Sequence, residues 1–224
     1  MIPIVSVGNM RISDAYTIAR FVPSLELMYR AAMGVFKAYH WPGSTAILVG
    51  SGNNGGDGFA LAWILQERGF HCTVFTVSQK ISPDSAFYAE KAREAGVPVC
   101  SFGAGALNGY DTVVDCLLGT GFSGTVRGNY RDAIEAINAS GAFVISVDIN
   151  SGMNGDSGVA ELAVRSDLTV TIGFVKTGLV TENAGNYIKR LVCADIGIVL
   201  VREEGFITEE ICPPWLDMHG ISSQ

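Results

Sequence analysis

Residues 45–58 read TAILVGSGNNGGDG, a short apolar run followed by a loop of five glycines and two adjacent asparagines. The next residues, Phe59 to Leu65, place apolar side chains at helical spacing, and Gly69 ends that stretch. A β-strand, a glycine-rich loop and an α-helix in this order predict one unit of a parallel α/β fold. Glycines let a ligand approach the backbone, and a helix N-terminus binds anions, so this loop is a candidate binding loop.

Six more apolar runs recur along the chain and alternate at first with helical patterns. They are continuous, as in strands buried on both faces, and not alternating as in half-exposed strands. Helices are expected from Ser82 to Ala95 and from Tyr130 to Ala139. The sequence therefore predicts a three-layer α/β/α, Rossmann-like fold around a doubly wound, mostly parallel sheet. The further predicted strands are 71–77, 98–102, 112–117, 143–149, 167–173 and 191–197.

The 224 residues carry 15 basic and 22 acidic side chains, a net charge of −7. Such a charge opposes binding to nucleic acid or to an anionic membrane surface, which both need clustered lysine and arginine. Five cysteines show no paired or metal-finger spacing, so we expect a reduced chain. We see no signal peptide and no run of about 18 apolar residues. These features predict a cytoplasmic protein without a membrane span.

The two ends of the chain differ from the alternating middle. In the first 44 residues, Pro23 and Ser24 open a helix that runs to about Tyr39 and is expected to pack outside the sheet. The tail after Gly205 contains Cys212-Pro213-Pro214 and is expected to form a peripheral strap. No repeat or linker interrupts the sequence, so one domain is expected over 1–224.

The loop Gly50–Gly58 also matches the dinucleotide fingerprint GxGxxG. That fingerprint needs an acidic residue at the end of the second strand, where this chain reads Thr76-Val77-Ser78-Gln79. No Lys-Ser/Thr pair follows the glycines, so the loop is not a Walker motif either. A conventional NAD-dependent oxidoreductase is therefore the weaker hypothesis.

Two more loops follow predicted strands, Gly119–Thr125 and Asp148–Gly152. Because the strands are parallel, all three loops gather at the carboxyl edge of the sheet, where ligands of such folds bind. Asp148 ends an apolar strand there and is a candidate general acid/base, the alternative being an Asx-turn that closes the strand. Lys176 could contact phosphate, tune Asp148 or simply be solvated.

Asp115 lies inside the apolar strand VVDCL, where a carboxylate is costly unless it is paired. It either accepts backbone N–H groups at the strand end or ligates a cation together with Asn54 and Ser151. One carboxylate with neutral oxygens suits a monovalent ion better than Ca²⁺, which usually gathers several carboxylates. The histidines lie away from these motifs and are expected to be structural; they are His40, His71 and His219.

The chain resembles the NAD(P)HX epimerase family, the YjeF N-terminal domain, over nearly its full length. The resemblance rests on NNGGDG at 53–58, DxLxGTG at 115–121 and VDIxSG at 147–152, with DIG at 195–197 in support. It implies an isomerase that interconverts the R and S forms of hydrated NADH or NADPH (NADHX, NADPHX). It also implies a separate dehydratase as functional partner, a homodimer, and a domain with a helical segment at 1–44 and a tail at 206–224.

By this resemblance, Asp148 is the catalytic residue, and Asn54, Asp115 and Ser151 bind one K⁺ per subunit. The residues that the resemblance assigns to the substrate are Asn53, Asn54, Gly55, Gly56, Asp57, Gly119, Thr120, Gly121, Phe122, Ser123, Gly124, Thr125 and Asp148.

The chain departs from the family at Asn150, where proline is usual. A non-catalytic nucleotide-binding or scaffold module is the alternative function that this departure favours. Proline fixes φ, so Asn150→Pro is expected to add about 0.4–1 kcal/mol of stability if the native backbone fits.

Overall fold

A seven-stranded parallel sheet forms the centre of the fold in the computed structural model, which describes residues 1–218. The strand order is β4-β3-β2-β5-β6-β7-β9. Each strand lies within one of the seven apolar runs, so the predicted doubly wound α/β fold is confirmed. The strands are β2 (Thr45–Val49), β3 (Cys72–Thr76), β4 (Val99–Ser101), β5 (Thr112–Cys116), β6 (Phe143–Val147), β7 (Leu168–Ile172) and β9 (Leu191–Ala194).

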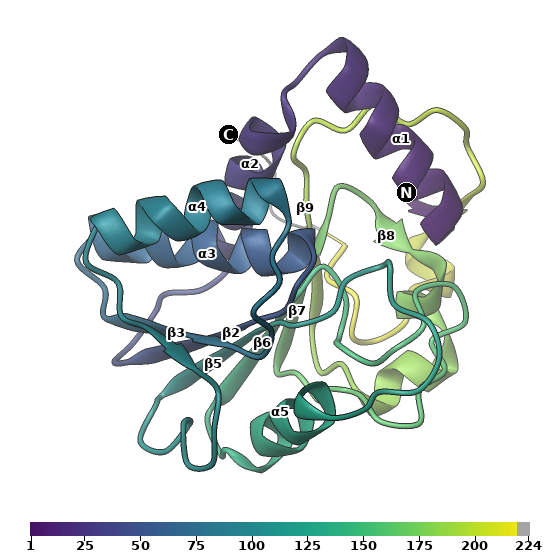
Figure 1. Cartoon of the computed structure of the whole chain (residues 1–224). Helices are drawn as coiled ribbons and strands as arrows, with labels where there is room; N and C mark the ends of the chain where they lie inside the picture. The colour runs from purple at the N-terminus through teal and green to yellow at the C-terminus, as the bar shows by residue number, and fades with distance from the viewer. Residues whose placement is uncertain (219–224) are drawn as a thin grey trace.

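Helices cover both faces of this sheet (Figure 1). On one face lie α2 (Ser24–Lys37), α3 (Asn53–Glu67) and α4 (Pro83–Glu94), and α3 packs against both of the others. The opposite face carries α5 (Asn129–Ala139). Ser82 caps α4 by accepting a hydrogen bond from the Ser85 amide, as its sequence pattern predicts.

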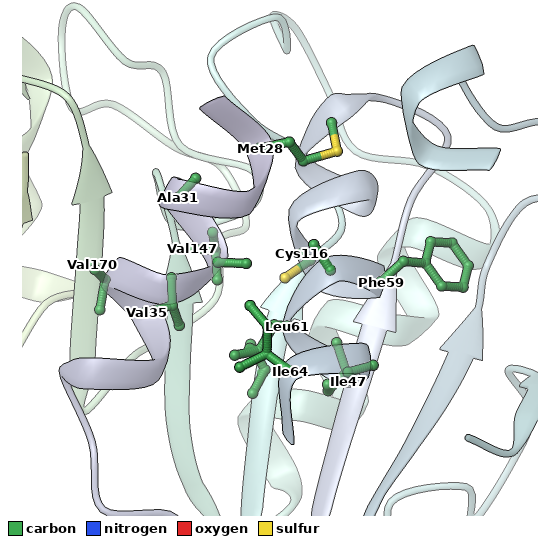
Figure 2. Close-up of a cluster of buried hydrophobic side chains, with 14 of the residues drawn as sticks. Met28, Ala31, Val35, Ile47, Phe59, Leu61, Ile64, Cys116, Val147 and Val170 are labelled. Atoms are coloured by element: carbon green, nitrogen blue, oxygen red, sulfur yellow. The ribbon is translucent and has the colours of Figure 1, made fainter. Parts of the chain in front are cut away.

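The apolar core fills the space between these layers. Figure 2 shows Val35 of α2 and Leu61 and Ile64 of α3 pointing toward the strand residues Val147 and Val170. A second cluster lies under α5, whose buried residues are Ala133, Ile134 and Ile137. Because both faces are covered, the central strands have no solvent side, which explains their continuous apolar runs, whereas the edge strand β4 is partly exposed.

The chain winds outward from β2 in two directions, first to β3 and β4 and then, across β2, to β5, β6, β7 and β9. The strand order therefore reverses between β2 and β5. In open α/β sheets a crevice forms at this switch point, outside the carboxyl ends of the strands. The loops after β2 and β5 flank it.

The N-terminal region contains more structure than the sequence predicts. Besides α2, it holds β1 (Ile2–Val5) and the helix α1 (Val7–Arg20). β1 lies between β8 (Val175–Lys176) and β10 (Gly205–Ile207) in a separate three-stranded sheet. Three short 3-10 helices complete the described residues; they are η1 (Thr177–Val180), η2 (Glu182–Asn186) and η3 (Glu209–Ile211).

The helix α1 is held by the chain segment 199–204, which runs beside it in Figure 1. Thr17 accepts a hydrogen bond from the Val199 amide, Ser13 accepts one from the Val201 amide, and Asn9 donates to the Arg202 carbonyl. The buried face of α1 is therefore largely polar. A search for apolar periodicity does not find such a helix.

None of the helices in residues 1–218 is both long enough and apolar enough to cross a membrane. His40 and His71 lie near the opposite, amino-terminal ends of β2 and β3, away from the motif loops. His219 lies outside the described residues.

Candidate functional site

A cavity of about 690 Å³ opens at the switch point and is called the switch-point cavity below. Its volume is in the range of small-molecule sites. The loops after β2 and β5, the end of β6, and the helices α1 and α2 line it. Of the residues assigned to substrate by resemblance, the lining includes Asn53, Asn54, Asp57, Gly119, Thr120, Gly121, Phe122, Ser123 and Asp148.

Four of the residues assigned to the substrate lie outside this lining: Gly55, Gly56, Gly124 and Thr125. The first two have a structural reason to be glycine. A Cβ at Gly55 would lie 2.4 Å from the Gly50 carbonyl oxygen, and one at Gly56 would lie 2.6 Å from the Met28 side chain. These glycines let the start of α3 pack closely against the β2 loop and α2. The N-terminus of α3 thereby faces the cavity with its unpaired N–H groups, a favourable place for an anion.

Asp148 follows β6 and has φ of +68°, a conformation that residues other than glycine rarely adopt. The Ile149 amide donates to the Val147 carbonyl oxygen at 2.8 Å, so Asp148 is the centre of a tight γ-turn. Such strain persists only where the surrounding structure imposes it, and it is common at active sites. The turn directs the carboxylate of Asp148 into the cavity, and no Asx-turn forms there.

Lys176 is 1% exposed and donates to Asp148 Oδ1. Its ammonium group also donates to Thr171 Oγ1 at 3.1 Å and to the Ile172 carbonyl oxygen at 2.7 Å. Lys176 is therefore not a solvated lysine. It neutralises Asp148 and fixes one carboxylate oxygen, while Oδ2 lies on the side of Gly119, 3.7 Å from the place of a Cβ there.

Asp115 is fully buried and accepts four hydrogen bonds, all from uncharged donors. Its two oxygens accept from the amides of Leu117 and Ser151 and from the hydroxyls of Ser146 and Ser151. Burial raises the pKa of Asp115, and these hydrogen bonds oppose the rise. Asp115 thus joins the ends of β5 and β6 beneath the cavity.

The side chain of Asn54, unlike that of Asp115, is not satisfied by hydrogen bonds. It is 7% exposed, and neither its Oδ1 nor its Nδ2 has a hydrogen-bond partner among the described residues. A buried amide without partners is costly, so this side chain calls for a ligand, ion or water. The donor set of Asn54, Asp115 and Ser151 fits a monovalent cation in that respect. Asn54 and Ser151 offer neutral oxygens, and among residues 1–218 the charge of Asp115 has no cationic partner.

Three further carboxyl groups line the cavity: Asp57 of α3, Asp14 of α1 and Asp84 of α4. Burial and then the charge of Asp148 raise the pKa of Asp14. The same two causes, joined by Asp14, raise the pKa of Asp57 well above its usual value, and Lys176 opposes them. Asp14 could not be recognised from the sequence, because the sequence patterns do not predict the helix α1. In a helix, a carboxylate one turn after an arginine, as Asp14 is after Arg11, has the spacing of an ordinary solvent-exposed ion pair. The sequence therefore does not mark Asp14 as a site residue.

The structure gives the Asn150 side chain a set of hydrogen bonds that proline could not make. Asn150 is fully buried, and its amide donates to Val164 O, Ser166 Oγ and Tyr187 O while accepting from Thr169 Oγ1. Its side chain therefore joins three segments of the chain behind the site. Asn150 does not line the cavity, so the departure from proline is explained by packing.

Comparison with known proteins identifies the family. The family model for the YjeF-related protein N-terminus matches residues 24–178. An NAD(P)H-hydrate epimerase from Limosilactobacillus fermentum is 38% identical over 199 residues, which are 85% of this chain and 95% of that protein. One from Rhodopirellula baltica is 35% identical over 89% of this chain and 86% of that protein.

Two further proteins extend the comparison. A bifunctional NAD(P)H-hydrate repair enzyme from Coxiella burnetii is 38% identical over 79% of this chain but 38% of its own length. The solved structure of yeast ynu0 superimposes with a TM-score of 0.72 at 21% identity, over 92% of this chain and 97% of that one, which supports the fold. By its matching model and its relatives, the chain belongs to the YjeF-related family that includes the NAD(P)H-hydrate epimerases.

Proposed function

We propose that this protein is an isomerase that interconverts the R and S epimers of hydrated NADH and NADPH. The observation that carries the proposal is the Asp148 carboxylate, which a strained γ-turn and Lys176 hold at the floor of the switch-point cavity. Relatives named NAD(P)H-hydrate epimerase support it. The epimers differ at one ring carbon that carries a hydroxyl group beside the ring nitrogen.

The chemistry at that carbon needs proton transfer. A proton given to the hydroxyl group lets it leave as water, because the lone pair of the ring nitrogen stabilises the cation. Water then returns from the other face and loses a proton. Asp148 is suited to exchange these protons, because Lys176 binds one of its oxygens and the other lies on the side of Gly119.

The rest of the cavity suits the nucleotide. The free N–H groups at the start of α3 favour the negatively charged phosphates. The loop Gly119–Ser123 forms the facing wall, and Phe122 in it offers an aromatic surface for a ring. No acidic residue follows β3 to bind a ribose in the manner of NAD dehydrogenases, which disfavours the oxidoreductase hypothesis.

Potassium is proposed as the ion held by Asn54, Asp115 and Ser151. It would satisfy the amide oxygen of Asn54 and balance the charge of Asp115, and so hold the loops after β2, β5 and β6 together. KCl should then raise the thermal unfolding midpoint more than equal LiCl. Asp115→Asn should abolish that difference, and an equal response to both salts would exclude a specific site.

We further propose that a dehydratase consuming one epimer is the functional partner. The bifunctional relative from Coxiella burnetii, named a repair enzyme, supports this link.

The deciding experiment starts from purified (R)-NADPHX and follows the ratio of epimers by chromatography, with an enzyme-free reaction as background. The protein should accelerate the approach to equilibrium, and Asp148→Asn should not. A non-catalytic binding module would bind the nucleotide and leave the rate at background.

A further inference from the structure

The switch-point cavity contains more acidic groups than the single acid/base of the proposed function requires. Asp14, Asp57, Asp84 and Asp148 line it, together with Arg11 and one buried ammonium group, that of Lys176. Lys176 is bound to Asp148. Within residues 1–218, the carboxyl groups of Asp14 and Asp57 make no hydrogen bond or ion pair and so face the cavity without a partner.

Of these two carboxyl groups, Asp57 is the one whose pKa is raised well above its usual value. Burial disfavours its charge most, followed by the charges of Asp148 and Asp14, and Lys176 offsets only part of this. Arg11 also lines the cavity, but it is not among the charges that shift the pKa of Asp57. Tyr88 on α4 and Cys116 on β5 both feel the charge of Asp57, and both have a raised pKa, about 12 for Tyr88, so they stay neutral.

We propose that Asp57 is a second catalytic residue, the carboxylic acid that protonates the departing hydroxyl group while the Asp148 carboxylate accepts the proton of the incoming water. The inference rests on the proposed function and deepens it. Asp57 lies one turn into α3, after Asn53 and Asn54, in the same lining as Asp148. A pair of carboxyl groups whose environments differ in this way is typical of a division into acid and base.

The proposed reaction removes one hydroxyl group as water and adds one water molecule, and the two carboxyl groups exchange the protons. Asp57 gives its proton to the hydroxyl oxygen, the C–O bond breaks with its electron pair on that oxygen, and the nitrogen lone pair forms a C=N bond. Water then adds to the carbon, the C=N electrons return to nitrogen, and the proton lost by this water passes to Asp148. The reverse conversion begins with the proton on Asp148, and exchange with solvent restores the first state.

Asp14 acts through Asp57 and is a positioning residue. Its charge is one of those that raise the pKa of Asp57. Asp14 reaches the cavity from α1, outside the span matched by the family model. Removing that charge should lower the pKa of Asp57. The alkaline limb of the pH–rate profile, where Asp57 loses its proton, should therefore move to lower pH.

The test measures kcat and KM for conversion of (R)-NADPHX between about pH 5 and pH 9. Asp57→Asn should lower kcat by about 10²- to 10⁴-fold and change KM by less than about threefold. Asp14→Asn should keep most of the activity at the optimum and shift the alkaline limb down by about one unit. Asp132→Asn, the same change in the first turn of α5 on an exposed residue, is the matched control and should alter neither.

A second measurement needs no turnover. Carbon-13 NMR of labelled aspartate carboxyls should show one group titrating well above the usual range, absent in Asp57→Asn and lower in Asp14→Asn. If the wild type does not epimerise the hydrate, the proposed function fails, whatever this titration shows. Wild-type kcat in Asp57→Asn, a change in KM alone, or an ordinary titration of Asp57 would each overturn the catalytic assignment.

Discussion

Asp115 and Asp148 stand at the ends of adjacent strands, β5 and β6, and their environments differ in almost every respect. Asp115 is fully buried, and four uncharged donors satisfy both of its oxygens. Asp148 is 16% exposed at its side chain, has a left-handed backbone and is bound to a lysine. Asp115 joins the strands through its hydrogen bonds, whereas Asp148 is held in place by its backbone turn and by Lys176.

The difference shows how a parallel sheet produces two kinds of carboxylate from similar sequence. Both aspartates follow or interrupt a run of β-branched residues. What separates them is the donor that the neighbouring segment supplies: Ser151 of the loop after β6 for Asp115, and Lys176 of β8 for Asp148. Neutral donors hold a buried charge in place, whereas one cation at one oxygen leaves the other oxygen available for chemistry.

The largest expected effect comes from Asp148→Asn, which should lower epimerisation by about 10²- to 10⁴-fold. It should also destabilise the fold by about 3 kcal/mol, because Lys176 stays buried without its counter-charge. Epimer chromatography measures the first effect, and urea unfolding measures the second.

The double variant Asp148→Asn/Lys176→Met separates these effects. It should regain most of the stability and none of the activity, because methionine leaves no buried charge. Recovery of turnover in the double variant would show that Asp148 serves only to balance the lysine.

Asp115→Ala should act on stability, with a loss of about 3 kcal/mol or more, since it leaves buried donors of Leu117, Ser146 and Ser151 unsatisfied. Ser146→Ala is the matched control, which removes one donor and should cost about 1 kcal/mol. Equal losses in the two variants, measured by urea unfolding, would contradict the role of Asp115 as a junction.

Asn150→Pro tests the loop that follows Asp148. It removes four buried hydrogen bonds of the Asn150 side chain and should cost about 2–4 kcal/mol, the opposite of what the family preference for proline suggests. Asn138→Ala removes two hydrogen bonds to the same 163–165 segment from an exposed position, and water can replace them. It should therefore cost less than about 1 kcal/mol. A stabilised Asn150→Pro would refute this account.

The smallest expected effect concerns Glu204, far from both aspartates. Hydrogen bonds, chiefly from the Ser6 amide and then from Arg202, lower its pKa to about 2 from a usual 4.5. Its contribution to stability is therefore complete above pH 4.5 and is lost as the pH falls toward 2. Glu204→Gln should unfold at lower temperature than the wild type at pH 6 and equally at pH 2. Glu203→Gln should match the wild type at both pH values.

The sheet could be predicted because strands that are buried on both faces have continuous apolar runs, which are visible in the sequence. Each of the seven strands lies in a continuous apolar run, and the glycine-rich loops mark the edge at which the cavity opens. The position of Asp148 at this edge could be predicted in the same way, because Asp148 follows one of these runs. Its pairing with Lys176 was one of three alternatives that the sequence left open, because 27 residues separate the two and no local pattern specifies that β8 leaves the main sheet.

The N-terminal part of the site could not be predicted for a different reason. The helix α1 buries Asn9, Ser13 and Thr17, and these polar residues are read in a sequence as a solvated face. Their partners are backbone groups of residues 199–202, almost the whole chain away. A helix whose packing depends on such distant hydrogen bonds gives no periodic signal, and Asp14 was lost with it.

The same hydrogen bonds have a consequence for the order in which the protein folds. During synthesis the parallel sheet has strands β2 to β7 available before residue 199 leaves the ribosome. The helix α1, although made first, cannot dock until its partner segment exists. Contacts between positions so far apart in the chain form slowly, since the loop between them must close first. We therefore expect the wall of the cavity that carries Arg11 and Asp14 to form last, once residues 199–204 are available.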